Sequence, residues 1–209
     1  MAERIYLNLL LKNSQSSHAF AKLVKRIEAG EVFVYPTETI YGIGGRADRE
    51  TVRKRINKAK TRKHENQMIL LAGNKKVFDC LGVTFPQAGQ FLAKQFWPGP
   101  LTLILPCQNK KEPIAVRISD HPFIVKLYKK LSIPIFSTSA NKSGKTYVND
   151  PDEIFSIFKS KIDFMVDAGA LPPSPPSTVV KIINDKKIEM VREGAISTKE
   201  IISAFVNKS

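Results

Sequence analysis

The residues best suited to chemistry are hydroxyl, amide and cationic side chains in short polar segments at the ends of predicted strands. Thr37 and Thr39 follow the strand predicted at 32–35 and precede three closely spaced glycines. Hydroxyl groups beside bare backbone at the end of a buried strand suit a small anionic ligand. A polar turn leading into the next helix is the alternative for this segment taken alone.

Three further polar segments, at 60–66, 137–141 and 174–177, also follow predicted elements. Ligands of open α/β sheets bind just beyond strand ends, so these segments can converge on one crevice. Lys60 and Arg62 suit a polyphosphate, because the ammonium is a compact charge and the guanidinium can fork across two oxygens.

Two arginines inside predicted strands, Arg117 and Arg192, extend this set. An arginine beside apolar strand residues is costly to bury unless an anion accompanies it. A surface or edge position is the alternative for each arginine, and for each considered singly we favour that alternative.

The elements that must position these residues alternate between helix and strand. Helices are predicted at 17–29, 48–59, 86–96 and 121–131, with two more starting at the capping residues Asp150 and Ser197. Strands are predicted at 32–35, 68–72, 101–105, 114–118, 133–138 and 162–167, with a hairpin over 178–192. This alternation predicts one α/β domain over residues 1–209 with a mixed sheet.

Positive charge is the most pronounced global property of this 209-residue chain. Its 33 Lys and Arg against 19 Asp and Glu give a formal net charge of +14. Such a field attracts polyanions, among them nucleic acid, nucleotides and acidic membrane surfaces. Seven of the eleven residues at 53–63 are basic and none is acidic. A solvated helix face is the ordinary explanation, but we favour a functional role for so dense a run.

The composition carries no signal for membrane insertion or export. No apolar run approaches the roughly 20 residues that span a bilayer. The N-terminal segment has no basic region followed by a cleavage site of small residues, so we expect no signal peptide. Two cysteines without metal-ligand spacing argue for a reducing compartment and against a structural zinc site. We therefore expect a cytoplasmic protein without a membrane partner.

Seven motifs occur in a fixed order along the chain. They are PTETIYGIGGRA, the Lys60-x-Arg62 pair, FWPGPLTLIL, AVRISDHP, STSANKSG, PSTVV and VREGAI. In this order they resemble the YrdC family, which contains the L-threonylcarbamoyladenylate synthases. The resemblance implies an α/β fold: a YrdC-like twisted open mixed sheet with flanking helices and a basic concave face. Because the motifs end near the end of the chain, we expect a short form with the catalytic domain only.

The resemblance implies an enzyme, a nucleotidyltransferase that condenses L-threonine, bicarbonate or CO2, and ATP to threonylcarbamoyl-AMP and pyrophosphate. A partner protein would then transfer the threonylcarbamoyl group to adenosine 37 of tRNAs that read codons starting with A, the t6A modification. The resemblance also implies Mg2+ accompanying ATP, with no side chain assigned to the metal, and tRNA or other RNA on the basic face.

Carried over by motif, the resemblance implies adjoining sites for threonine and ATP. The threonine-binding residues are expected to be Thr39, Arg117, Ser137 and Ser177. The ATP-binding residues are expected to be Lys60, Arg62, Asn66, Ser139, Asn141 and Arg192. Lys60 and Arg62 are expected to be catalytic, because positioning and cationic stabilisation do most of the work in transfer at phosphorus.

An alternative from a different class is a non-catalytic RNA-binding module, or a paralogue of uncertain function, that uses the same basic face. Its basis is the charge of +14 and the run at 53–63. In addition, Arg192-Glu193-Gly194 replaces the usual Arg-Pro-Gly, a form also seen in a paralogous subfamily. That subfamily tends to lack the Lys-x-Arg pair and the Ser-Ala-Asn signature, which this sequence retains, so we favour the enzyme.

Overall fold

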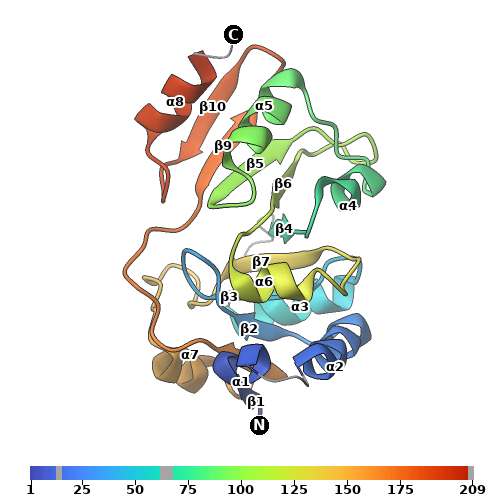
Figure 1. Cartoon of the computed structure of the whole chain (residues 1–209), viewed down its shortest axis with the longest axis vertical. Coiled ribbons are helices and arrows are strands. Elements are labelled where there is room, and N and C mark those ends of the chain that lie inside the picture. Colours follow the sequence, from blue (N-terminus) through green and yellow to red (C-terminus); the bar gives the residue numbers. More distant parts are fainter. Residues whose placement is uncertain (13–15, 62–67, 207–209) are drawn as a thin grey trace.

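The computed structural model describes residues 1–12, 16–61 and 68–206. Over these residues the chain forms one ten-stranded sheet with helices on its faces, in the order β1-β8-β2-β3-β7-β4-β6-β5-β9-β10 (Figure 1). The strands are β1 (Glu3–Tyr6), β2 (Phe33–Tyr35), β3 (Gly42–Arg46), β4 (Ile69–Leu71), β5 (Leu101–Leu105), β6 (Ile114–Arg117), β7 (Ile135–Ser139), β8 (Phe164–Asp167), β9 (Thr178–Ile182) and β10 (Ile188–Arg192). The helices are α1 (Leu7–Lys12), α2 (Ser16–Ala29), α3 (Glu50–Ala59), α4 (Lys75–Cys80), α5 (Gln87–Phe96), α6 (Pro122–Leu127), α7 (Pro151–Phe158) and α8 (Thr198–Val206).

The sheet is mixed, as the sequence predicts. Strand β2 pairs antiparallel with β3 and parallel with β8, while β5 pairs antiparallel with β6 and parallel with β9. Figure 1 shows β1, α1, α2 and α7 at one end of the molecule and β9, β10, α5 and α8 at the other. The segment between β8 and β9 runs along one side of the molecule from the first end to the second. The predicted α/β class with an open mixed sheet is confirmed.

The half of the sheet around β2 is covered on both faces. Phe33 and Tyr35 pack in one apolar cluster with residues of α2 and α6. Val32 and Val34 pack in another with residues of α3 and α7. Successive strand residues point to opposite faces, so a strand between two helical layers must be apolar at every position. This accounts for the uninterrupted apolar run at 32–35.

Among the described residues, helices cover one face of the half of the sheet around β5. Leu101, Leu103 and Leu105 are fully buried in a third cluster that includes residues of α5 and α8. The alternate residues Thr102 and Ile104 line a cavity on the other face. The uncovered face of this half is therefore where polar side chains can meet a ligand.

Local capping signals correctly predicted where helices begin. The Asp150 side chain accepts hydrogen bonds from the backbone N–H groups of Asp152 and Glu153 at the start of α7. Ser197 Oγ accepts from the backbone N–H of Glu200 at the start of α8.

The predicted hairpin is the antiparallel pair of β9 and β10. Among the described residues, no helix combines the length and apolar character that a membrane crossing requires.

Four elements lie outside the predicted set: β1, α1, β3 and α4. Strand β3 takes the glycine-rich segment after Thr39, which the sequence pattern treats as a polar turn. Glycine has low strand propensity, but it permits close approach of another backbone. A Cβ added at Gly44 would lie 1.9 Å from the carbonyl oxygen of Phe136 on β7. The helix predicted at 121–131 is shorter in the structure, where α6 begins at Pro122 and ends at Leu127.

Candidate functional site

A cavity of about 360 Å³ lies on the uncovered face of the sheet. The residues that line it and were predicted from the sequence are Thr39, Arg117, Ser137, Ser139, Ser177 and Arg192. They come from the β2–β3 connection, from β6, β7 and β10, and from the residue preceding β9. The apolar lining includes Ile40, Ile69, Ile104, Ala115 and Val179. The fold thus gathers hydroxyl and guanidinium groups from distant segments around one apolar floor.

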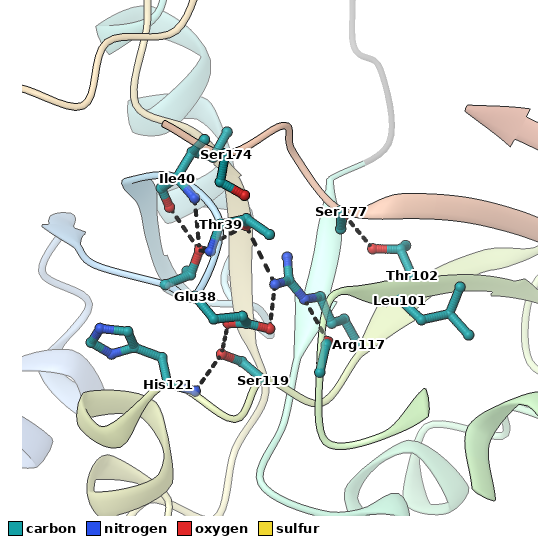
Figure 2. A network of polar contacts seen from close by, with 12 residues as sticks. Glu38, Thr39, Ile40, Leu101, Thr102, Arg117, Ser119, His121, Ser174 and Ser177 are labelled. Atoms are coloured by element: carbon teal, nitrogen blue, oxygen red, sulfur yellow. Dashed lines mark hydrogen bonds and ion pairs between the residues drawn. The ribbon is translucent and has the colours of Figure 1, made fainter. Parts of the chain in front are cut away.

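Arg117, the last residue of β6, is held along one edge of its guanidinium. Its Nε donates to the carbonyl oxygen of Gly99 at 3.2 Å. Its Nη2 donates to Glu38 Oε1 at 2.5 Å and, at 3.4 Å, to Thr39 Oγ1. Figure 2 shows the remaining nitrogen directed toward the space between Thr39 and Ser177. The arginine expected to bind a ligand carboxylate therefore already holds a carboxylate of the protein.

Glu38 is held from a second direction by the loop that follows β6. Ser119 Oγ donates to Glu38 Oε2 and accepts from the backbone N–H of His121. Burial opposes ionisation of Glu38, but the charge of Arg117 and these hydrogen bonds outweigh it, so the pKa of Glu38 is lowered. Partial burial and then the charge of Glu38 raise the pKa of Asp120. Glu38 is therefore the ionised partner of Arg117 at neutral pH.

Arg192 lies at the end of β10, where its guanidinium folds onto Ser177. Its Nη2 and Nε donate to the carbonyl oxygen of Ser177 at 2.7 Å and 3.2 Å, and Nη2 also approaches Ser177 Oγ at 3.3 Å. Ser177 Oγ shares a hydrogen bond with Thr102 Oγ1 at 2.9 Å. Partial burial and then the charge of Arg117 lower the pKa of Arg192. Among the described residues no carboxylate pairs with Arg192, so this side of the cavity favours an added anion.

Lys60, predicted to be catalytic, follows the last residue of α3 and is only 3% exposed. Its Nζ donates to the carbonyl oxygens of Ser139 and Asn141 and, at 3.3 Å, to Asn141 Oδ1. Ser139 Oγ donates to the same Asn141 Oδ1. Lys60 and Asn141 do not line the cavity as described, whereas Ser139 does. In this conformation Lys60 therefore orders the loop at 139–141.

Two residues of the predicted ATP site, Arg62 and Asn66, lie outside the described residues. Their contacts with ATP stay predictions. The cavity is described without them and without the rest of the segment 62–67.

The basic run at 53–63, which contains no acidic residue, has acidic partners from outside it. Arg53 pairs with Glu50 one turn earlier on α3, at 2.7 Å. Arg55 pairs with Asp163, just before β8, also at 2.7 Å. The charge of these two arginines is therefore partly neutralised by ion pairs within the fold.

The polar residues of the site that were not singled out from the sequence include Glu38 as the partner of Arg117, Ser119 as the partner of Glu38, and the lining residues Thr102 and Tyr147. Thr102 had a detectable signal, because it is the one hydroxyl within an otherwise apolar strand. Tyr147 lies in a segment without periodicity, so only the folded chain reveals its position. Within the described residues, no group of three or more His, Cys, Asp or Glu side chains is arranged to hold a metal.

Comparison with known proteins assigns this fold and cavity to a family. The family model for Sua5, YciO and YrdC proteins, described as "Telomere recombination", matches residues 25–194. The chain belongs to this family. The match includes every residue named above as lining the cavity, and it confirms the resemblance inferred from the seven motifs.

Curated relatives with the name threonylcarbamoyl-AMP synthase match most of the chain. The Bacillus subtilis protein is 31% identical, over 98% of this chain and 61% of its own length. The Pyrococcus abyssi protein is 33% identical, over 84% of this chain and 54% of its own. A putative threonylcarbamoyl-AMP synthase of Methanocaldococcus jannaschii is 34% identical, over 86% and 87%. The chain therefore spans less than two thirds of the first two relatives and most of the third.

Solved structures of family members share the fold. P. abyssi Sua5 complexed with L-threonine superposes with a TM-score of 0.84 at 28% identity, covering 98% of this chain and 60% of that one. Escherichia coli YciO superposes with a TM-score of 0.81 at 23% identity, covering 96% and 100%. The likeness to YciO is evidence of the fold alone.

Proposed function

We propose that the protein is a threonylcarbamoyl-AMP synthase, which converts L-threonine, bicarbonate or CO2, and ATP to threonylcarbamoyl-AMP and pyrophosphate. The observation that carries the proposal is the convergence of Arg117, Arg192 and several hydroxyl groups on one cavity. Membership of the Sua5/YciO/YrdC family and the names of three relatives support it.

The two sides of the cavity suit the two larger substrates. The threonine carboxylate would meet Arg117, with hydroxyl groups of Thr39, Ser137 and Ser177 around it. Such a carboxylate forms charge-assisted hydrogen bonds with a guanidinium. The phosphates of ATP would lie toward Arg192 and the loop ordered by Lys60. That loop contributes Ser139 and Asn141, and Arg62 and Asn66 are expected to complete the phosphate contacts.

The chemistry requires positioning and positive charge rather than a side-chain nucleophile. The amine of threonine forms an N–C bond to CO2 and loses a proton, or forms it to bicarbonate with loss of water, which gives a carbamate. A carbamate oxygen then bonds to the α-phosphorus of ATP while the bond to the bridging oxygen breaks and pyrophosphate leaves. Negative charge on the phosphoryl oxygens and leaving group would be stabilised by the cationic groups. We propose that Mg2+ arrives as part of the ATP complex.

The product is an activated acyl donor and would be used by a partner protein. The partner would transfer the threonylcarbamoyl group to adenosine 37 of tRNAs that read codons starting with A. The net charge of +14 supports contact with tRNA or other RNA on the basic face. We place the reaction in the cytoplasm, where ATP and tRNA are both present.

The deciding experiment measures pyrophosphate released by the purified protein with L-threonine, bicarbonate, Mg2+ and ATP. We expect release that depends on L-threonine and is small when L-serine replaces it. Absence of threonine-dependent release would overturn the proposal. The second candidate, a non-catalytic RNA-binding module, is favoured by the charge of +14. It predicts strongly salt-dependent RNA binding without affinity for ATP or threonine.

The predicted phosphate contact of Arg62 can be tested against a basic residue of the same run. Loss of one preorganised cationic donor typically costs about 2.7–4 kcal/mol of transition-state stabilisation, or roughly 100- to 1000-fold in rate. Arg62→Ala should slow pyrophosphate release by this factor, while Lys54→Ala, at an exposed position of α3, should leave it nearly unchanged. Equal slowing by both variants would show that the run acts only as a general positive field.

A further inference from the structure

The connection between β2 and β3 reaches across the sheet to meet β6. Three strands, β3, β7 and β4, separate β2 from β6 in the sheet. The connection nevertheless contacts Arg117 and the loop after it, through Glu38 Oε1 to Arg117 Nη2 and Glu38 Oε2 to Ser119 Oγ. The other hydrogen bond between them, Arg117 to Thr39 Oγ1, is long at 3.4 Å. Thr39 Oγ1 is also bonded within the connection, to Thr37 Oγ1 at 3.0 Å. Glu38 therefore supplies the shortest contacts between this connection and the β6 side of the cavity.

Glu38 also determines which part of Arg117 faces the cavity. A guanidinium has five N–H donors in a rigid planar fork. Gly99 accepts from Nε and Glu38 accepts from Nη2, so one edge of the fork is occupied by the protein. Among the described residues no acceptor is bonded to Nη1, which points toward the space between Thr39 and Ser177 (Figure 2).

We propose that Glu38 is a positioning residue for the carboxylate end of the amino-acid substrate. It acts through Arg117 and Thr39 and does not touch the ligand, since it is not among the residues that line the cavity. The side chains of Arg117 and Glu38 are only 6% and 16% exposed, so little water competes for their contact. This inference rests on the proposed function, because it takes L-threonine as the ligand at Arg117.

Geometry and charge make opposite predictions for this residue. The Glu38 carboxylate orients Arg117, which strengthens binding of a carboxylate ligand. It also neutralises Arg117, which weakens the attraction for any anion. Glu38→Gln keeps an acceptor oxygen for the guanidinium and removes the charge, whereas Glu38→Ala removes both. Positioning therefore predicts that only the alanine variant binds L-threonine weakly, while pure neutralisation predicts tighter binding by both variants.

The experiment measures the Kd values of L-threonine and ATP separately by calorimetry for the wild-type chain and the variants. Loss of one charged hydrogen bond corresponds to roughly tenfold to 100-fold in affinity. We expect Glu38→Ala to weaken L-threonine by this factor and Glu38→Gln to remain within about threefold of wild type. ATP affinity should change by less than about threefold in both variants. Glu112→Ala, at an exposed position that does not line the cavity, is the matched control.

The possible failures are distinguishable. If the wild-type chain does not bind L-threonine, the proposed function fails, and the cause does not lie in the role assigned to Glu38. If the wild type binds and Glu38→Ala binds equally well, the positioning role is overturned. A parallel loss of L-threonine and ATP affinity would indicate a merely structural role and would also overturn it.

Two further measurements keep the inference testable if Glu38→Ala does not fold. Ser119→Ala removes one contact to Glu38 and leaves the ion pair, so it should weaken L-threonine modestly without affecting ATP. L-threoninamide lacks the carboxylate, so its binding should not respond to Ser119→Ala. An equal loss for L-threonine and L-threoninamide would contradict action through the carboxylate.

Discussion

The two arginines of the cavity are held in different ways. Arg117 is buried and pairs with the carboxylate of Glu38. Arg192 is an exposed residue whose guanidinium donates to neutral oxygens of Ser177. A buried guanidinium needs a nearby anion, whereas one with access to water does not. The cavity therefore combines two different cations. Arg117 is neutralised by Glu38 and suits a single carboxylate, whereas Arg192 has no carboxylate partner among the described residues and suits the greater charge of phosphates.

The difference between Arg117 and Arg192 should be largest in their contributions to the free energy of unfolding. Arg117→Ala would leave the Glu38 carboxylate buried without its partner, which typically costs about 3–5 kcal/mol. Arg192→Ala breaks hydrogen bonds at the surface and should lower the free energy of unfolding by about 1 kcal/mol or less. Urea denaturation of both variants measures the difference. Equal losses would show that the two arginines are held alike.

Ligand affinity should also separate the two sides of the cavity, because loss of Arg192 should affect ATP more than L-threonine. Arg192→Ala should weaken ATP by roughly tenfold to 100-fold, the loss expected for one charged hydrogen bond. L-threonine should change by less than about threefold, because its carboxylate is assigned to Arg117. Calorimetric titration measures both, with Lys187→Ala, an exposed residue before β10, as the control. Equal weakening of the two ligands would contradict separate sides.

Acid should weaken the ion pair between Glu38 and Arg117. The pKa of Glu38 lies below its ordinary value of 4.5. On acidification the unfolded chain therefore takes up this proton first. The stabilising contribution is complete above about pH 4.5 and is lost as the pH falls through the lowered pKa of the folded state. Between neutral pH and about pH 3, wild type should therefore lose more stability than Glu38→Gln, which has no carboxylate to protonate. Parallel denaturation profiles would show that this ionisation contributes nothing.

The smallest effect concerns the second carboxyl group beside Glu38. The pKa of Asp120 is raised, so its ionised form is disfavoured in the folded state. The cost develops as the pH rises above the ordinary value of 3.8. Asp120→Asn should therefore stabilise the protein slightly at neutral pH, by about 0.5 kcal/mol or less for an exposed residue, with no gain in acid. Calorimetric melting measures it, and destabilisation at neutral pH would contradict the repulsion.

Glu193 shows how a departure from the usual family motif is accommodated. Its Oε2 accepts a hydrogen bond of 2.9 Å from the backbone N–H of Thr198 at the start of α8. Hydrogen bonding to Thr198 also lowers the pKa of Glu193. The neighbouring Arg192 keeps its contact with Ser177. The glutamate thus stabilises a helix terminus, and the guanidinium still reaches the cavity.

Lys60 makes contacts that its residue type alone does not predict. Its charge and its spacing from Arg62 predicted a phosphate contact, which stays a prediction. In the folded chain its Nζ donates to oxygens of residues 139 and 141, which are 79 and 81 positions away. A buried ammonium must be surrounded by acceptors. Which acceptors surround it depends on β7 ending beside α3, and no local pattern in the sequence encodes that contact.

By itself, the sequence determined the helices with an apolar face, the strands between helical layers, the capped helix starts, and the set of hydroxyl and cationic residues at strand ends. These features follow from local spacing and side-chain chemistry. Only the tertiary structure decided which charges meet. Glu38 and Arg117 are 79 residues apart, and three strands lie between β2 and β6. Their pairing depends on strand order and on the path of one connection, which are non-local properties of the folded chain.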